Sequence, residues 1–377
     1  MTGGPRFPSS EEPKGLIYHY TNQAGLLGIL SSKEIWATHI RYLNDASEYN
    51  RGLEIVKTCV KDFAIDIDKF EIETGSKFPI NNFQSAEIDL VLRDTIAKSL
   101  SLIDEFSVFV TSFFSNDEDA PNLSEHDIGD VLGQWRGYSG GSAGFSIGFD
   151  KSILSGYFGE IGENEESPLV YASCIYNEDR QRTYIQKCVS AFGPMLLRHL
   201  SSVMLEFQQA VLPSMMKGIQ EEFIIACPEA NSDRVVERAI ARAMSRFSDM
   251  WEDERPAFTE SATSLITKLI VPPIFMKHPS FAEEREWRAA KLYKGDTVAL
   301  RFRPGKSSLI PYIAIPLPVQ HVDKELIKRI VVGPTPKVEE AITAVKMLLR
   351  SNGYKVKKFN EETGVEVISS QIPYRDW

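Results

Sequence analysis

The spacing of apolar residues divides the start of the chain into a strand, a helix and a second strand. Residues 16–21, LIYHYT, and residues 35–43, IWATHIRYL, are rich in the aromatic and β-branched residues that favour strands. Between them, residues 22–34 carry apolar side chains at helical spacing. Asn22 is the expected N-cap, because its side-chain oxygen can accept a free backbone N–H. The expected buried face of this helix consists of Leu26, Leu27, Ile29 and Leu30.

The same patterns predict further strands and helices along the chain. β-Branched and aromatic residues predict a buried strand over 106–115. Residues 145–150 alternate, with the apolar side chains of Phe145, Ile147 and Phe149 on one face. A helix over 338–353 is expected to end at Gly353, the usual position of a glycine C-cap. The remaining expected strands are 169–176, 286–293, 312–317, 329–333 and 365–370, and the remaining expected helices are 51–75 and 84–103.

A helical block interrupts this β-rich pattern between about residues 180 and 270. Three stretches within it have helical period, and strands precede and follow it. Strands outside and helices inside predict an α+β core with a helical insertion. We therefore expect a flexible N-terminus over 1–15 and a single domain over 16–377 that contains the insertion.

Composition narrows the class of protein without naming a function. The 377 residues are 43% hydrophobic and 25% charged, as in soluble globular proteins, and no apolar run reaches the roughly 18 residues that span a bilayer. Four scattered cysteines without a CxxC pair predict reduced thiols in a cytoplasm. Six scattered histidines give no metal signature, so no metal is expected. The net charge of −10 does not favour a nucleic-acid partner, although it leaves room for a local basic groove.

Two kinds of motif, the histidine in YHYT and two GxSxG matches, do not by themselves predict a reaction. His19 stands between two tyrosines at the end of the first strand, where either packing or ligand binding would explain it. Two GxSxG matches place Ser139 in a glycine-rich loop and Ser146 inside a strand. A hydrolase nucleophile needs a tight turn between a strand and a helix, and neither serine has that context.

A cluster of carboxylates at 281–293, FAEEREWRAAKLY, is the strongest chemical signal. If Glu284 and Glu286 lie in an extended segment, their side chains share one face. Paired carboxylates suit cleavage at a sugar anomeric carbon, because the transition state is a positively charged oxocarbenium. The alternative is a charged helical turn.

A second polar segment, YLNDASEY, has two explanations. Asn44 and Asp45 can cap a helix, with Glu48 as a capping-box partner, or the segment can form the rim of a ligand site.

Taken in order, the motifs resemble those of a widespread bacterial family of uncharacterised proteins that is grouped with the ADP-ribosyltransferase-like fold. No single motif is specific, but the ordered set is. The resemblance implies a split β-sheet core that holds NAD in the cleft between two small sheets. The matching stretches are YHYT (18–21), IRYLNDASEY (40–49), TSFFS (111–115), QWRGYSGGSAGFSIGFD (134–150), FAEEREWR (281–288), IVVGP (330–334) and IPYR (372–375).

The resemblance also implies roles for individual residues. His19 would hydrogen-bond the ribose next to the adenine, and Glu286 would bind the 2′-hydroxyl of the nicotinamide ribose. Glu284 is the alternative catalytic carboxylate, and Tyr138 would stack on the nicotinamide ring. The residues expected to bind the cofactor are His19, Tyr20, Thr21, Asn44, Ser112, Ser115, Trp135 and Tyr138.

The function implied by the resemblance is NAD-dependent ADP-ribosyl transfer by a toxin or an anti-phage defence effector. The acceptor would be RNA, DNA or protein, with an antitoxin or chaperone as a candidate partner and no membrane. The alternative is a catalytically inactive module of the same fold that binds a nucleotide or a protein. The position of Glu286 distinguishes the two hypotheses. In the enzyme it faces the same cleft as His19, and in the inactive module it is a solvated charge.

Overall fold

The described residues of the computed structural model belong to two compact units. The larger unit comprises residues 6–53, 104–181 and 271–377, and the other comprises residues 1–5, 54–103 and 182–270. In the second unit the described residues include the end of α2 (Ser47–Lys61) and a helical segment over 182–190. Most of the predicted insertion lies outside the described residues. The structure describes residues 15–43, 47–62, 106–115, 129–138, 143–164, 169–190, 269–295, 299–305, 307–318 and 326–373.

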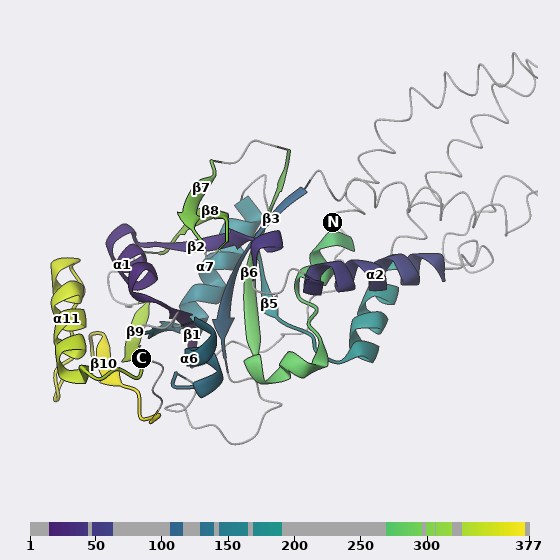
Figure 1. The fold of residues 1–377 in the computed structure, drawn as a ribbon. Helices are drawn as coiled ribbons and strands as arrows, with labels where there is room; N and C mark the ends of the chain where they lie inside the picture. Colours follow the sequence, from purple (N-terminus) through teal and green to yellow (C-terminus); the bar gives the residue numbers. More distant parts are fainter. Residues whose placement is uncertain are drawn as a thin grey trace, which may run out of the picture. The chain divides into compact units, whose positions relative to one another are not determined.

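The larger unit is built on a ten-stranded, mostly antiparallel sheet, so its fold class is α+β (Figure 1). Its main path runs β10-β9-β4-β1-β3-β2-β8-β7, with β6 also paired to β3 and β5 paired to β6. Of the described strand pairs, β9 with β10 is parallel. The strands are β1 (Leu16–Thr21), β2 (Glu34–His39), β3 (Phe106–Phe114), β4 (Phe145–Asp150), β5 (Leu169–Ser173), β6 (Glu286–Lys294), β7 (Arg301–Pro304), β8 (Leu309–Pro316), β9 (Ile327–Val332) and β10 (Glu366–Ser369).

The sheet branches at β3. Strand β6 pairs with β3 along its whole length, from Phe106 to Phe114, and so occupies one edge of it. Because a strand has only two edges, β1 and β2 must share the other. Strand β1 pairs there at Phe114, and β2 pairs at Val110 and Phe109. The intervening residues 111–113 lie at the point where the β1 and β2 branches separate.

Most strands lie where the sequence places them, but the predicted strand over 35–43 ends at His39 and continues as the 3₁₀ helix η1 (Ile40–Tyr42). Three further elements were missed. Helix α6 (Leu132–Tyr138) and helix α7 (Lys151–Asn164) occupy a stretch that we predicted to be loop or left unassigned. Both contain glycines, which disfavour helices by about 1 kcal/mol each relative to alanine and hide the helical signal. Strand β7 is only four residues long and ends in proline. Among the described residues, no helix is both long enough and apolar enough to cross a membrane.

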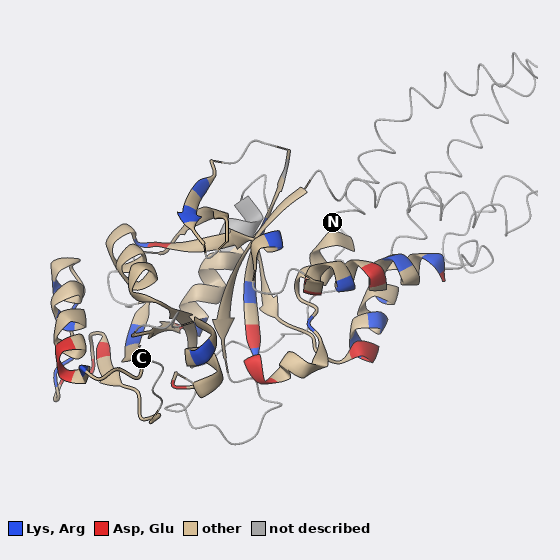
Figure 2. Ribbon diagram, viewed as in Figure 1, with Lys and Arg blue, Asp and Glu red and all other residues tan. Residues whose placement is uncertain are grey.

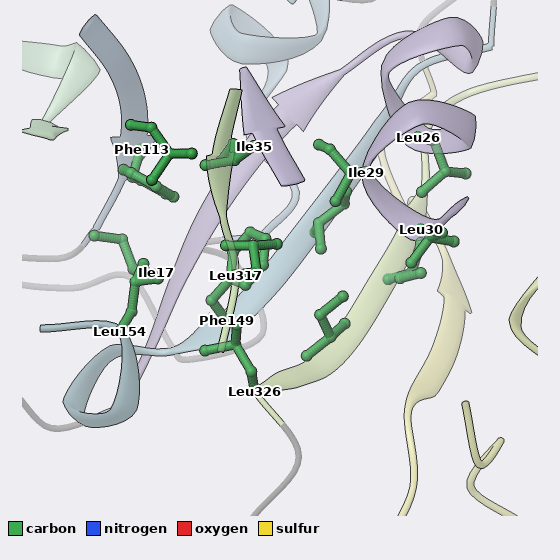
Figure 3. Packing of buried hydrophobic residues seen from close by; sticks show 14 of the residues in the cluster. Ile17, Leu26, Ile29, Leu30, Ile35, Phe113, Phe149, Leu154, Leu317 and Leu326 are labelled. Carbon is green, nitrogen blue, oxygen red and sulfur yellow. The ribbon is translucent and has the colours of Figure 1, made fainter. Parts of the chain in front are cut away.

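The main core lies on one face of the sheet, which we call the helix-rich face. Ile17, Phe113 and Phe149 point into this core (Figure 3). Helices α1 (Gln23–Ser32), α7 and α11 (Val338–Ser351) contribute apolar residues to it. The alternation predicted for β4 is confirmed, since its three apolar residues all belong to this cluster.

Helix α1 shows how closely a local sequence pattern fixes its own packing. The predicted N-cap is confirmed, because Asn22 Oδ1 accepts a 3.0 Å hydrogen bond from the backbone N–H of Gly25. Leu26, Ile29 and Leu30 are buried at helical spacing, as expected. Leu27 is 52% exposed, so its predicted burial is wrong. It lies one position outside the apolar stripe and faces away from the core.

Helix α6 packs on the opposite face of the sheet near β1, and we call this face the α6 face. Tyr18, Tyr20, Phe114, Trp135 and Val331 form its buried cluster. Paired residues of neighbouring strands share a face, and residues two apart along one strand do so as well. Since Tyr18 pairs with Phe114, and Phe114 with Glu286, the α6 face also carries Glu286.

The close approach of Tyr18 to β4 gives a first stability prediction. A Cβ atom added at Gly148 would lie 2.8 Å from Tyr18 Cε1, whereas one added at Gly156 of α7 would meet nothing within 4 Å. We expect Gly148→Ala to destabilise the protein by about 1–3 kcal/mol through overpacking. The matched Gly156→Ala should stabilise it by about 0.5–1 kcal/mol, because alanine favours helix. Urea unfolding measures both, and the same sign for the two variants would contradict this packing.

Candidate functional site

A turn, and not a strand, brings the two predicted carboxylates together. Glu284 ends the 3₁₀ helix η4 (Pro279–Glu284), and Glu286 begins β6. Arg285 between them has left-handed backbone geometry (φ 40°), and Ser115 N–H donates a 3.2 Å bond to its carbonyl. The condition of one extended segment is therefore not met, and for Glu284 the alternative of a helical turn is confirmed. The carboxylates nevertheless meet, because Lys277 Nζ lies 2.5 Å from Glu284 Oε2 and 2.6 Å from Glu286 Oε2.

Glu286 is the centre of a buried ionic cluster. The residue is 5% exposed, and both of its carboxylate oxygens are occupied. Oε1 accepts a 2.8 Å bond from Arg288 Nε, while Oε2 accepts from Lys277 and, at 3.1 Å, from Arg288 Nη2. Arg288 Nη1 donates a further 2.6 Å bond to the carbonyl of Ile274. This arrangement fixes the Glu286 side chain in place and leaves it no free oxygen.

Glu48 is a member of this cluster that sequence reasoning assigned differently. It lies in the first turn of α2, where we expected a capping-box interaction. Its Oε2 accepts a 2.8 Å bond from Arg288 Nη2, and its Oε1 lies 3.2 Å from Lys277 Nζ. These two cations stabilise a carboxylate that is only 8% exposed, and the capping box with Asp45 stays a prediction. The predicted caps Asn44 and Asp45 lie outside the described residues.

The charges of the cluster do not cancel. The carboxylates of Glu48, Glu284 and Glu286 face the cations of Lys277 and Arg288, so three negative and two positive charges leave a net charge of −1. Burial alone would raise the pKa of Glu286, but the adjacent charges of Arg288 and Lys277 outweigh it and lower the pKa to about 2. Figure 2 shows acidic and basic residues side by side where η4 leads into β6.

Glu284 differs from its partners in its access to solvent. Its side chain is 33% exposed, compared with 6% for that of Glu286. The described contacts of Glu284 use Oε2, through Lys277. A carboxylate that is held by one cation and still open to solvent can receive the hydroxyl or the developing positive charge of a substrate. Of the two predicted catalytic residues, Glu284 therefore has the geometry for contact and Glu286 the geometry of an anchor.

Two tyrosines interact with the carboxylate segment, Tyr138 through charge and Tyr176 through a hydrogen bond. Tyr138, at the end of α6, is 37% exposed. Burial of its phenol group, together with the charges of Glu286 and Glu284, raises the pKa of Tyr138. The hydroxyl oxygen of Tyr176 accepts a 2.8 Å bond from the backbone N–H of Glu286 and helps to fix the start of β6. The charges of Glu286 and Glu284 thus act on Tyr138, and its stacking on a nicotinamide ring stays a prediction.

The structure does not place His19 with the carboxylates. His19 follows Tyr18 in β1 and therefore projects from the helix-rich face, opposite Glu286, with its ring centroid 5.8 Å from that of Phe113. Its Nδ1 donates a 2.9 Å bond to the carbonyl of Ser112, where β1 and β2 separate. Burial lowers the pKa of His19, which favours the neutral ring. The expected joint site of His19 and Glu286 is therefore contradicted by strand alternation.

The other predicted binding residues have mixed positions. Ser112 pairs with Arg288 and so lies on the α6 face, beside the ionic cluster. Tyr20 and Trp135 pack against each other, with ring centroids 4.8 Å apart, and the Tyr20 hydroxyl accepts a 3.1 Å bond from Val131 N–H. Tyr20 therefore packs in the buried cluster of the α6 face, and its expected role in binding the cofactor stays a prediction. Ser115 is buried, Thr21 shares the helix-rich face with His19, and Asn44 is not described.

Comparison with known proteins adds a family match but no function. A family model described as "Protein of unknown function (DUF2971)" matches residues 134–289, which is less than half of the chain. The match runs from α6 into β6 and so includes Tyr138, Lys277 and Glu284. No curated protein and no solved structure matches the chain. Among the described residues, no three His, Cys, Asp or Glu side chains are grouped to hold a metal ion.

The depressed pKa of Glu286 predicts how stability depends on pH. Its ionised form is favoured in the folded protein, so this stabilisation is complete above about pH 4.5, the ordinary pKa of glutamate, and is lost as the pH falls toward 2. We expect the urea midpoint of the wild type to fall over this range. Glu286→Gln should be less stable at pH 7, and its deficit should shrink as the pH falls.

An exposed glutamate supplies the control for this titration. The side chain of Glu178 is 61% exposed in its ion pair with Arg51, so Glu178→Gln should follow the wild-type curve closely. Parallel curves for the wild type and Glu286→Gln between pH 4.5 and 2 would contradict the assignment.

Proposed function

We propose that this chain is an NAD-dependent ADP-ribosyltransferase. Glu284 contacts the substrate, and Glu286 positions Glu284 through their shared partner Lys277. The observation that carries the proposal is the convergence of both carboxylates on Lys277, with Glu284 alone of the pair open to solvent. An anionic oxygen at this position can bind a ribose hydroxyl and stabilise positive charge on the sugar ring. Lys277 holds the carboxylate in place, and the net charge of −1 in the cluster favours a cationic transition state.

The proposed reaction replaces one bond at the anomeric carbon of the nicotinamide ribose. The C–N bond to nicotinamide breaks, and its electron pair leaves with nicotinamide, which is then neutral. The resulting oxocarbenium is stabilised by Glu284. A nucleophile of the acceptor then forms the new bond to the same carbon and loses its proton to solvent or to a nearby base. NAD supplies the activated leaving group, and no metal is needed in this scheme.

The branched sheet supports the same proposal at the level of the fold. The resemblance described above implies a split sheet, and β1 and β2 diverge from one edge of β3. The ionic cluster begins at the end of β6, which occupies the other edge. We propose that the larger unit has an ADP-ribosyltransferase-like fold. In this proposal His19 is a structural residue of the branch point, and the acceptor is RNA, DNA or protein.

A second candidate function is supported by the neutralisation of Glu286. Since Arg288 and Lys277 occupy both of its oxygens, Glu286 has little capacity left for a ribose hydroxyl. A module that binds a nucleotide or a protein without catalysis would tolerate that neutralisation. Under this alternative the cluster is a purely structural element of the α6 face. Biological roles as a toxin or defence effector, with an antitoxin or chaperone partner, belong to the enzymatic proposal.

Nicotinamide release from NAD distinguishes the two candidates. We would incubate purified protein with adenylate-labelled NAD and an extract of its host, and measure nicotinamide and the label in protein, RNA and DNA separately. The wild type should release nicotinamide and label one fraction. Glu284→Gln should lower the release about 100-fold, as expected on losing one charge-stabilising group in a transition state.

The neighbouring carboxylate offers a matched control. Glu283 is exposed, so Glu283→Gln should change the rate by no more than about twofold, as is usual for surface substitutions. Equal loss in Glu283→Gln and Glu284→Gln would refute the assignment of Glu284. Absence of nicotinamide release and of label with folded wild-type protein would reject the enzyme and leave the binding module.

A further inference from the structure

Arg303 of β7 carries a charge that the described residues do not neutralise. Its Nη2 donates a 3.2 Å bond to Thr38 Oγ1, and its Nε is buried without a hydrogen-bond partner. No ion pair joins it to a carboxylate of the described segments. Burial lowers the pKa of Arg303, yet a guanidinium stays protonated at neutral pH. The unsatisfied Nε is unfavourable, and the remaining donors of this half-buried guanidinium can bind an anion.

The adjacent arginine of the same strand provides the contrast. Arg301 forms a forked pair with Glu34, with distances of 2.6 Å and 3.3 Å to the two carboxylate oxygens. That pair raises the pKa of Arg301 and neutralises its charge. The two arginines are two residues apart and so share one face of β7. Their different pairing leaves Arg303 as the cation available to a ligand.

Strand register places Arg303 on the same sheet face as the carboxylates. Arg301 pairs with Tyr312, Tyr312 with Thr38, and Thr38 with Val110. Val110 in turn pairs with Ala290 of β6, and Glu286 lies four residues before Ala290 on the same face. This cross-strand row belongs to the α6 face. Thr38 lies two strand spacings from Ala290 across the sheet, and Glu286 lies four residues from Ala290 along β6. Together these place the backbones of Thr38 and Glu286 about 16 Å apart.

This separation matches a substrate that is longer than one sugar. A group bound by Arg303 would lie on the same face as a ribose bound at Glu284, at the distance of a connected part of a nucleotide or of a second substrate. Phosphate is the anion that fits, because a guanidinium offers several parallel donors to its oxygens. The Thr38 hydroxyl supplies one more polar group. The chain's net charge of −10 opposes long-range attraction, so the interaction must be local.

We propose that Arg303 and Thr38 form a phosphate-binding site for a nucleotide used in the reaction, which rests on the proposed function above. The phosphate belongs either to NAD or to a nucleic-acid acceptor. Both sources offer the same chemistry to Arg303. They differ in which probe loses affinity when the guanidinium is removed.

Binding measurements test this site without requiring turnover. We would measure the Kd of NAD by calorimetry and the Kd of labelled single-stranded DNA and RNA oligonucleotides by fluorescence anisotropy, for the wild type and Arg303→Gln. Arg303→Gln should weaken one of these ligands about tenfold, since hydrogen bonds to a charged group contribute on that scale. If the oligonucleotide is the ligand, the salt dependence of its binding should also fall by about one unit of slope.

Two variants of β7 control for charge and folding. Arg301→Gln removes an arginine that Glu34 already neutralises, so it should weaken binding by less than about twofold. Arg303→Lys keeps the charge but loses the parallel donors of the guanidinium, so it should recover only part of the affinity. If Arg303→Gln loses affinity for NAD, the phosphate belongs to NAD. If it loses affinity for an oligonucleotide, the phosphate belongs to the acceptor. Unchanged affinity for every probe, or no binding by the wild type, overturns the site. Because no step here requires nicotinamide release, failure of the catalytic proposal would be seen separately.

Discussion

The buried ion pair between Glu286 and Arg288 is the constraint on which the site depends. Taking two charges out of water is unfavourable by several kcal/mol per ion, and their attraction offsets this only when the remaining hydrogen-bonding groups are satisfied. Here the carbonyl of Ile274 and the carboxylate of Glu48 take up the remaining donors of Arg288. The cluster therefore links the start of α2, the segment before η4 and the start of β6. Any shift in one of these elements would leave a charge unpaired.

The branch in the sheet explains why this cluster lies where it does. Strand β3 carries β6 on one edge and both β1 and β2 on the other, so the α6 face continues from β1 across β3 to β6. The hydrogen bond from His19 to Ser112 supports the branch point from the opposite face. His19 and Glu286 thus act on two sides of one strand. His19 stabilises the branch point, and Glu286 fixes the charged side chains beside it.

The sequence predicted most of the strands and the two carboxylates but not the network around them. Strand patterns are local, and β1, β3 and β4 follow from alternation and β-branched composition. Glu284 and Glu286 stood out because they are close in sequence. Their partners are distant, since Glu48 lies 240 residues from Arg288, and no periodic signal connects them. The single residue Lys277 carries no pattern at all. His19 was assigned to the wrong face because its role depends on register across β3, which one strand alone does not determine.

A double-mutant cycle on Glu286 and Arg288 tests the central role of their ion pair most directly. Urea unfolding of Glu286→Met, Arg288→Met and the double variant gives the three losses of stability. Each single change should destabilise the fold by about 3–5 kcal/mol, because it leaves buried charge without its partner. The double variant should lose less than the sum by at least about 1 kcal/mol, since both charges of the pair are gone. Losses that simply add would contradict the account, because they would show that the two residues act independently.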